Sequence, residues 1–401
     1  MLKYNIKYRI NLIICLFFLT TNIVAQEVEY KTDIKVGAED FQSYLTLLKN
    51  KQVGIVGNQT TAINGVHLVD TLLSLDVNIV KVFAPEHGFR GSADAGEKVK
   101  DDKDVKTGLP IISLYGKNKK PKAELISDLD IIIFDIQDVG ARFYTYISTM
   151  HYVMEAAAEN NKKVIVLDRP NPNGFYVDGP ILETKYKSFV GMHKVPIVHG
   201  MTIGEYAQML NGEKWLENGI QCDLTVVKCK NYEHKDFYKL PIKPSPNLPN
   251  MASIYLYPSL CLFEGTDVSV GRGTPTPFQI FGKPNVDGEF KFTPVPTDGA
   301  KRPKHKDMEC NGYNLVGFGN QKMREQKSLY LHWLVDMYKR SDNKDTFFVK
   351  NGFFNLLCGT REIRNMIEAG KSVEEIQKWY KKDVDTFKIT RKKYLLYTDF
   401  E

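Results

Sequence analysis

Short apolar runs alternate with segments of helical periodicity in the first half of the chain. Five apolar runs predict strands, at 53–56, from Val82 onward, and at 111–114, 131–134 and 164–167. Helical patterns fall between the runs at about 65–75, 122–126 and 144–160. Because this alternation is typical of βαβ units, it predicts an α/β fold with a mostly parallel sheet and helices on both faces.

Polar residues follow these runs directly, at the point where each predicted strand ends. Ligands of open parallel sheets bind beyond the carboxyl ends of the strands, so we expect the polar residues to converge on one cleft. The residues concerned are Asn58 after the first run, Glu86, His87 and Arg90 after the second, Asp135, Gln137 and Asp138 after the fourth, and Asn171 after the fifth.

The composition changes near residue 245. Four prolines fall between positions 241 and 249, which indicates an extended connection rather than a helix. We therefore expect two domains, at 38–245 and 246–401, the second smaller and of α/β or α+β type. In the second domain, Glu264 and Arg272 lie in turns bounded by glycines, where the backbone can approach a ligand closely.

Three further helices are predicted outside the clear βαβ pattern. Capping boxes predict one helix from Thr202 to about 211 and another from Ser372 to about Lys382. The segment 326–338 has apolar residues on one helical face, which predicts a third helix.

The first 25 residues have the pattern of a secretory signal peptide. Three basic residues precede an apolar run at 10–24 that ends in Ala25 and is short for a membrane span. An uncleaved anchor is the alternative. Cleavage after Ala25 would export the chain, with a periplasmic location and no membrane span remaining, and would lower the formal charge of +6 by three. Such a modest charge gives no reason to expect nucleic-acid binding.

The sequence lacks the motifs that are typical of metal, dinucleotide and serine-hydrolase sites. The cysteines are scattered, with Cys222 and Cys229 the nearest pair for a disulfide, and they suit buried apolar positions. The histidines are too dispersed to predict a metal site. Neither the glycine fingerprint of dinucleotide binding nor a serine nucleophile elbow occurs. We therefore expect no cofactor and no metal.

Carbohydrate hydrolysis suits the polar residues that remain. It needs an acid for the leaving oxygen, and a carboxylate, a base or a substrate N-acetyl group to meet the oxocarbenium ion. Amide side chains bind sugar hydroxyls, tyrosines such as Tyr144 stack on sugar rings, and an arginine such as Arg142 selects an acidic sugar.

Each of these residues also has a structural alternative. Glu86 can pair with Arg90 or cap a helix, and Asp138 can cap a helix as well. His87 can satisfy backbone carbonyls, while Asn58 and Asn171 can serve only as turn residues.

Six motifs together resemble the NamZ family of exo-β-N-acetylmuramidases. They include Ala-Pro-Glu-His-Gly-Phe-Arg-Gly at 84–91, and the others lie in order at 53–60, 135–146, 167–172, 199–205 and 263–274. The resemblance implies a Rossmann-like N-terminal domain, a smaller C-terminal domain and an active cleft between them. It also implies release of N-acetylmuramic acid from the non-reducing end of peptidoglycan fragments, whose muropeptides or disaccharides would be the binding partners.

The resemblance implies that Glu86 is the general acid. The second catalytic group stays open among Asp135, Asp138, Glu264 and the substrate's own 2-acetamido group. Candidates for the lactyl carboxylate of muramic acid are Arg90, Arg142 and Arg272. A non-catalytic, exported sugar-binding protein is the alternative from another class. The full set of candidate substrate-binding residues is Asn58, His87, Arg90, Gln137, Arg142, Tyr144, Asn171, His199 and Arg272.

Overall fold

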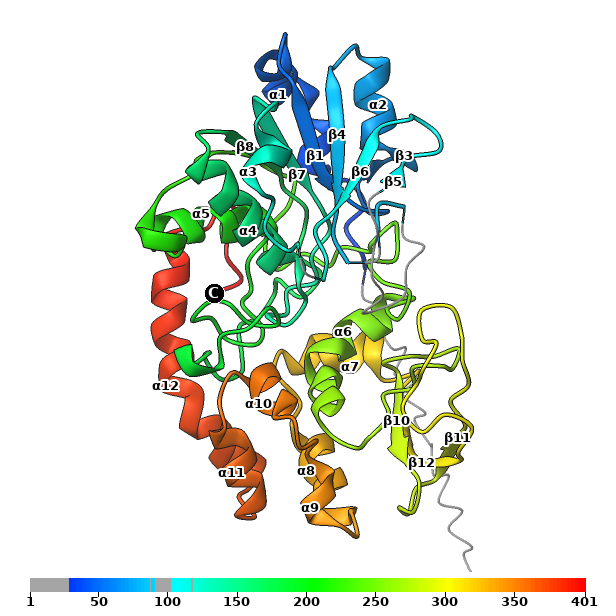
Figure 1. Ribbon diagram of the computed structural model, residues 1–401. Coiled ribbons are helices and arrows are strands. Elements are labelled where there is room, and N and C mark those ends of the chain that lie inside the picture. The colour runs from blue at the N-terminus through cyan, green and yellow to red at the C-terminus, as the bar shows by residue number, and fades with distance from the viewer. Residues whose placement is uncertain (1–28, 87, 91–101, 117) are drawn as a thin grey trace, which may run out of the picture.

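The computed structural model describes residues 29–86, 88–90, 102–116 and 118–401 (Figure 1). Two of the sequence-based predictions fall outside these residues, namely the signal peptide at 1–25 and the candidate ligand His87. Among the described residues, no helix combines the length and the apolar character that crossing a membrane requires.

A seven-stranded sheet forms the centre of the first half, in the order β5-β6-β4-β1-β7-β8-β9. All neighbours pair in parallel except β5, which is antiparallel to β6. Without β5, the parallel strands have the order 3-2-1-4-5-6 of Rossmann folds, which confirms the predicted fold class. The strands are β1 (Val53–Gly57), β4 (Ile79–Ala84), β5 (Asp102–Lys103), β6 (Pro110–Ser113), β7 (Ile131–Asp135), β8 (Lys163–Leu167) and β9 (Asp223–Val227).

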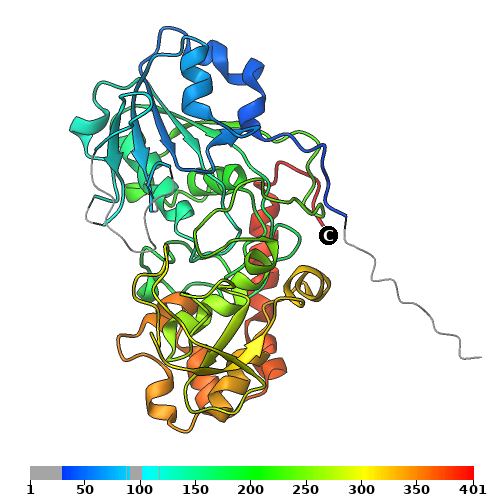
Figure 2. The same ribbon diagram turned by 90° about the vertical axis from the view of Figure 1, so that its right-hand side faces the viewer.

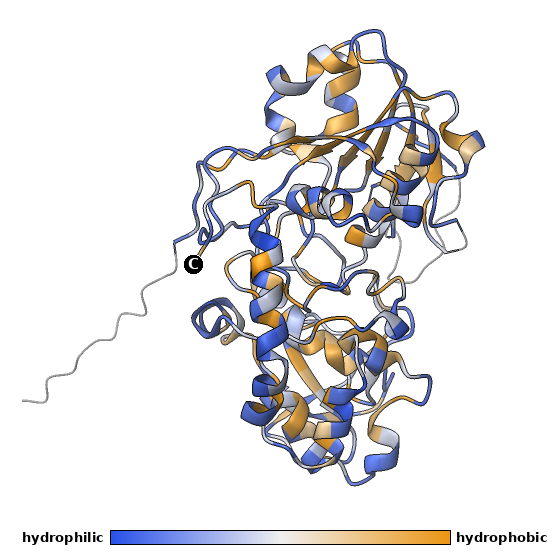
Figure 3. Cartoon of the chain, turned by 90° about the vertical axis from the view of Figure 1, so that its left-hand side faces the viewer, coloured by the Kyte–Doolittle hydropathy of each residue, from blue (hydrophilic) through white to orange (hydrophobic). Residues whose placement is uncertain are grey.

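Helices cover both faces of this sheet, because alternate strand residues point to opposite sides and both sets are apolar. Ile55 and Ile133 pack in one cluster with α1 (Phe41–Leu48) and α2 (Leu68–Ser74). Val56 and Phe134 pack in the other with α3 (Ala123–Ile126), α4 (Tyr146–Glu159) and α5 (Ile203–Gly212). Figure 3 shows the strands as an apolar layer between these helices.

The second half combines a small antiparallel sheet with seven α-helices among its described elements, and it lies below the large sheet in Figures 1 and 2. Its apolar residues join the cluster on the α4 side of the large sheet, so the two halves share a core. The elements are α6 (Met251–Leu260), β10 (Ile280–Lys283), β11 (Phe290–Phe292), β12 (Cys310–Asn314), α7 (Gly319–Gln326), α8 (His332–Arg340), α9 (Lys344–Phe347), α10 (Phe353–Cys358), α11 (Glu362–Glu368) and α12 (Val373–Lys392).

The remaining short elements lie in connections. They are the strands β2 (Ala62–Ile63) and β3 (Val66–His67), and the 3₁₀ helices η1 (Gly37–Glu39), η2 (Thr184–Tyr186), η3 (Glu217–Gly219) and η4 (Cys261–Gly265). The domain limits at 38–245 and 246–401 stay a prediction. All five cysteines among the described residues are buried and free, as expected for small apolar side chains.

The helix prediction was right at the capping boxes and only partly right between them. Both boxes form, with Thr202 and Ser372 as the caps. The helix predicted at 326–338 is right from His332 onward, where α8 lies, but its predicted start is wrong. Helix α7 ends at Gln326, and Lys327 adopts a left-handed φ of 47°. The last helix continues to Lys392, ten residues beyond the predicted end near Lys382.

Helix α6 went unpredicted, because it is buried on every side and so lacks a polar face that would show a helical period. Pro258 within it is also a residue that disfavours a helix interior.

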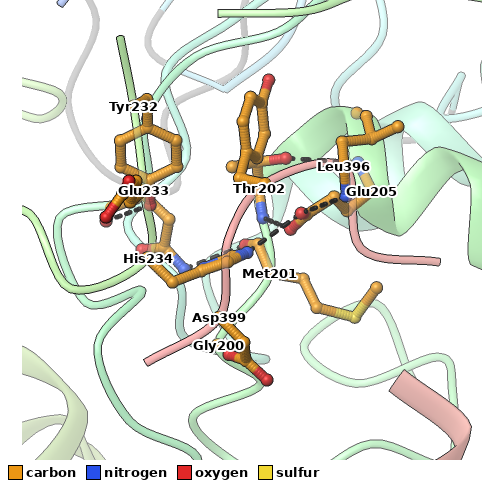
Figure 4. Close-up of polar contacts among 12 residues, drawn as sticks. Gly200, Met201, Thr202, Glu205, Tyr232, Glu233, His234, Leu396 and Asp399 are labelled. Carbon is orange, nitrogen blue, oxygen red and sulfur yellow. Dashed lines mark hydrogen bonds and ion pairs between the residues drawn. The ribbon is translucent and has the colours of Figure 1, made fainter. Parts of the chain in front are cut away.

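The C-terminal tail ties the last helix back to the first half. The α12 ribbon runs alongside both halves (Figures 1 and 2). Beyond it, the Leu396 amide donates to Glu205 Oε1 at 2.8 Å, and His234 Nε2 lies 2.9 Å from the same oxygen (Figure 4). The Tyr397 hydroxyl donates to Asp168 Oδ2 at 2.6 Å. The contacts of Leu396 and Tyr397 fix the C-terminal tail to α5 and to the exit of β8.

Candidate active site

A cavity of about 390 Å³ is lined by residues from both halves of the chain. The strand exits contribute Glu86 after β4 and Tyr115 after β6, and Thr145 precedes α4. The charged lining residues are Glu86, Lys119, Glu264 and Arg272, and the aromatic ones are Tyr115, Phe143, Tyr144, Tyr146, Phe189, Tyr257, Phe278 and Phe353. The rest of the lining is formed by Thr145, Val190, Ser245, Asn247, Leu248, Cys261 and Leu357.

Glu86 lies in a tight turn at the end of β4 and is held from two sides. The Gly88 amide donates to the Pro85 carbonyl at 3.1 Å, and Gly88 has a φ of 78°, a conformation that favours glycine. The Tyr115 hydroxyl donates to Glu86 Oε1 at 3.1 Å, and Thr145 Oγ1 donates to Oε2 at 3.1 Å. The carboxyl group is therefore positioned in the cavity wall by one hydroxyl from the exit of β6 and another from the start of α4.

The environment of Tyr115 keeps it a hydrogen-bond donor. Burial raises the pKa of Tyr115, and the negative charge of Glu86 raises that pKa further. The phenol therefore stays protonated and can hold the Glu86 carboxyl at neutral pH.

Glu264 is the second carboxylate of the cavity, and it comes from η4 in the other half. Arg272 Nε donates to Glu264 Oε1 at 2.8 Å, and the Arg272 guanidinium lies 4.9 Å from the centre of the Phe278 ring. Burial disfavours ionisation of Glu264, but the positive charges of Arg272 and Lys304 hold its pKa below the ordinary value. Glu264 is thus a carboxylate, fixed in one orientation by its arginine.

Lys304 connects this carboxylate to the surrounding backbone. Its Nζ donates to the Phe263 carbonyl at 3.1 Å and to the Val268 carbonyl at 3.0 Å, and it also donates to the Thr266 carbonyl. These carbonyls lie on both sides of Glu264 in the chain. Lys304 therefore closes the turn that carries Glu264.

The other two candidate carboxylates lie outside the cavity lining. Asp135 is fully buried and binds Arg169 through both oxygens, at 2.6 Å and 2.9 Å. Asp138 accepts from the Gly140 amide at 2.6 Å, and burial raises its pKa to about 7. These contacts give both aspartates structural roles, Asp135 at the end of β7 and Asp138 in the turn that follows.

His199 lies next to Asp138 and also stays outside the cavity lining. Its Nε2 is 3.8 Å from Asp138 Oδ2, while its Nδ1 accepts from the Met201 amide at 3.2 Å. Burial lowers the pKa of His199 to about 3, so the ring is neutral at physiological pH. Burial thus favours the neutral form of both groups, the imidazole of His199 and the carboxylic acid of Asp138.

Only one of the three candidate arginines lines the cavity, and that is Arg272. Arg90 binds both oxygens of Asp104 at 2.7 Å. Arg142 is fully buried and donates to the carbonyls of Pro180, Val195 and Leu357 at 2.7–2.9 Å. Arg90 and Arg142 therefore stabilise loops, and Arg142 supports the cavity from behind through Leu357.

The candidate amides bind the protein's own backbone or hydroxyls. Asn58 Nδ2 donates to the Tyr146 hydroxyl at 2.9 Å, Gln137 Nε2 donates to the Pro170 carbonyl at 2.7 Å, and Asn171 Nδ2 donates to the Met201 carbonyl at 2.9 Å. Tyr144 does line the cavity, and its hydroxyl donates to the Pro244 carbonyl at 2.8 Å. Of these residues, Tyr144 is the one that lines the cavity without using its side chain to bind another candidate.

The gap between β1 and β7, where Rossmann proteins bind nucleotides, is occupied by the chain itself. Thr61 Oγ1 donates to the Asp135 carbonyl, and a Cβ on Gly57 would lie only 2.5 Å from the same Thr61 oxygen. Ligand space is instead found beyond β4 and β6.

Several lining residues were missed by the sequence reasoning. Tyr115 follows the strand predicted at 111–114, so the strand-exit rule could have selected it. Lys119 is four residues further along the same loop. Asn247 and Tyr257 come from segments in which no sequence pattern points to a ligand.

Comparisons with known proteins match the chain over nearly its whole length. The family models described as exo-β-N-acetylmuramidase NamZ, N-terminal and C-terminal, match residues 53–252 and 255–397. The peptidoglycan β-N-acetylmuramidase NamZ of Bacillus subtilis (strain 168) is 41% identical over 397 residues, covering 94% of this chain and 93% of that protein.

Two crystal structures of DUF1343 family proteins from Bacteroides fragilis NCTC 9343 are also similar. One is 51% identical with a TM-score of 0.85, and the other is 34% identical with a TM-score of 0.76. Each comparison covers 92% of this chain and 100% of the other.

Proposed function

The chain belongs to the NamZ family of exo-β-N-acetylmuramidases, and we propose that it releases N-acetylmuramic acid from the non-reducing ends of peptidoglycan fragments, with Glu86 as general acid. Family membership makes the protein a glycoside hydrolase and decides against the non-catalytic sugar-binding alternative.

One observation carries the catalytic part of the proposal. Of the four carboxylates that the sequence suggested, the two that line the cavity are Glu86 and Glu264, and they come from opposite halves of the chain. Glycoside hydrolysis needs two groups with different tasks on the two sides of one bond. A sugar seated between the halves would have one carboxyl group from each.

The environments of the two groups suit different tasks. Neutral hydroxyls of Tyr115 and Thr145 orient Glu86, and such partners can hold a carboxyl group that carries a proton for the leaving oxygen. Glu264 is kept ionised by Arg272 and Lys304, so its negative charge can stabilise the oxocarbenium ion. It can do so as nucleophile, as base for water, or beside the substrate's 2-acetamido group.

The size of the cavity supports the exo mode. Its volume of about 390 Å³ lies at the small end of ligand sites, which span about 300–1,000 Å³. This space suits one terminal sugar rather than a stretch of glycan strand. The aromatic side chains of the lining, among them Tyr144 and Tyr257, offer faces on which a sugar ring can pack.

A peptidoglycan substrate lies outside the cytoplasm, which agrees with the export signal predicted from the sequence. We therefore extend the proposal to a periplasmic enzyme. Comparing the secreted and cytoplasmic fractions for the N-terminus of the mature chain tests this extension, and retention of residues 1–25 on a cytoplasmic enzyme would contradict it.

The exo activity is tested with peptide-free glycan strands whose terminal sugar is defined. Strands that begin with N-acetylmuramic acid should lose that monosaccharide, while strands that begin with N-acetylglucosamine should stay intact. Mass spectrometry of the products over time provides the readout. Internal fragments as early products would contradict the exo mode, and release of terminal glucosamine would contradict the sugar specificity.

A further inference from the structure

The cavity contains a cation that neither the sequence reasoning nor the proposed mechanism uses. Muramic acid differs from N-acetylglucosamine by a lactyl ether, whose carboxylate requires a positive partner when it is buried. Arg90 and Arg142 lie outside the lining, and Arg272 is already paired with Glu264. The remaining cationic side chain of the lining, among the described residues, is Lys119.

Lys119 is half-buried, and within the part of the chain that the structure describes its ammonium contacts an aromatic ring rather than a carboxylate. Its Nζ lies 4.3 Å from the centre of the Phe189 ring, which also lines the cavity. A cation over an aromatic face keeps its charge available on the opposite side. The pair thus presents a positive group beside an apolar surface.

Both members of this pair are held in place by neighbours. Lys120 binds Glu155 at 2.9 Å and Glu159 at 2.7 Å, which anchors the Lys119 loop to α4. Tyr115, at the other end of that loop, contacts Glu86.

Phe189 is fixed from the same helix. The Ser148 hydroxyl donates to the Phe189 carbonyl at 2.8 Å, and the Tyr152 ring stacks on the Phe189 ring. The Lys119 ammonium therefore lies in the same part of the cavity lining as Glu86, the proposed general acid.

We infer that Lys119 binds the lactyl carboxylate of muramic acid. This inference rests on the proposed function and assigns its sugar specificity to one residue. It replaces the arginines as the source of that specificity. In intact peptidoglycan the stem peptide converts this carboxylate into an amide, so Lys119 also gives a preference for peptide-free muramic acid.

The test compares a chromogenic β-muramide with its lactyl methyl ester and lactyl N-methylamide. Wild type should prefer the free acid in kcat/KM by about ten- to a hundredfold, the range expected for loss of a charged hydrogen bond. Lys119→Met should lower kcat/KM on the acid by that factor and leave the ester and amide unchanged. Lys119→Arg should retain much of the preference.

The matched control is Lys122→Met, which removes an exposed lysine from the same segment, outside the cavity lining. An undiminished acid preference in Lys119→Met would overturn the inference while leaving the muramidase function standing. So would a loss that appears only with substrates bearing a stem peptide, because the anion would then belong to the peptide.

Sugar binding can be measured without turnover, which tests the role of Lys119 separately from the hydrolase activity. Calorimetry with Glu86→Gln should show tighter binding of N-acetylmuramic acid than of N-acetylglucosamine, and Lys119→Met in that background should abolish the difference. If wild type does not hydrolyse the muramide but this binding pattern holds, the proposed function fails and the Lys119 assignment stands. Absence of any binding preference would overturn the assignment.

Discussion

Replacing Arg142 with methionine is expected to weaken the fold and to leave the substrate affinity of the folded enzyme near that of wild type. The sequence made Arg142 a candidate for the substrate's carboxylate. In the structure its guanidinium is fully buried and holds the carbonyls of Pro180, Val195 and Leu357, so it joins two loops of the first half to α10.

The size of the effect follows from two opposing contributions. Leaving a buried carbonyl unpaired costs about 1–3 kcal/mol, and methionine would leave two, those of Pro180 and Leu357. The Val195 carbonyl would lose a hydrogen bond worth about 1 kcal/mol, because it also accepts from the Leu182 amide at 3.3 Å. Removing the charge relieves its desolvation, which lowers the pKa of Arg142 from 12.5 to about 10 and is worth about 3 kcal/mol. We therefore expect the free energy of unfolding to fall by about 2 kcal/mol, within the range for loss of a buried polar network.

Urea unfolding gives the stability, and initial rates on a β-muramide at low temperature give KM for the folded fraction. Arg142→Lys should recover part of the stability. The matched control is Arg340→Met, which removes an exposed arginine paired with Asp336 and should cost less than about 1 kcal/mol. Unchanged stability together with a large rise in KM would refute the structural role and return Arg142 to the substrate site.

Two further predictions concern charge inside the protein. Burial raises the pKa of Asp138 from its ordinary value of 3.8 to about 7. The stabilising contribution of the protonated carboxyl is therefore complete below pH 3.8 and is lost as the pH rises through 7, so the free energy of unfolding of wild type should fall by about 1 kcal/mol per pH unit near pH 6–7. Urea unfolding at each pH measures this slope, and an equal slope in Asp138→Asn would contradict the prediction. Lys304→Met should lower kcat and move the acidic limb of the pH–rate profile to higher pH, because the Lys304 charge lowers the pKa of Glu264. The control Lys306→Met removes an exposed lysine and should leave the profile unchanged. An unmoved acidic limb in Lys304→Met would show that Lys304 acts only on the fold.

The parallel sheet could be predicted from the sequence because local patterns determine it. Each buried strand is a short apolar run, and both faces are covered, so the strands stand out from the amphipathic helices between them. The capping boxes at Thr202 and Ser372 are equally local. Helix α6 escaped prediction because its burial on all sides is a property of the whole fold.

The candidate site was predicted only in part, and the reason is also physical. The strand-exit rule located Glu86 but also selected Asn58, Asp135 and Asn171, whose side chains hold the central loops together. A sequence pattern shows that a polar group follows a strand, but its partner depends on distant loops. Glu264 reaches the cavity through contacts between the two halves, which only the three-dimensional structure reveals.

The role of Glu86 is tested most directly with two β-muramides that differ only in the leaving group, one an acidic phenol and the other N-acetylglucosamine. A general acid matters when the leaving oxygen needs a proton, so Glu86→Gln should lower kcat/KM on the disaccharide by about a thousandfold. On the phenol substrate the loss should be about tenfold or less, because a good leaving group needs little protonation. Equal losses on both substrates, or no loss on the disaccharide, would contradict the assignment of Glu86 as the proton donor.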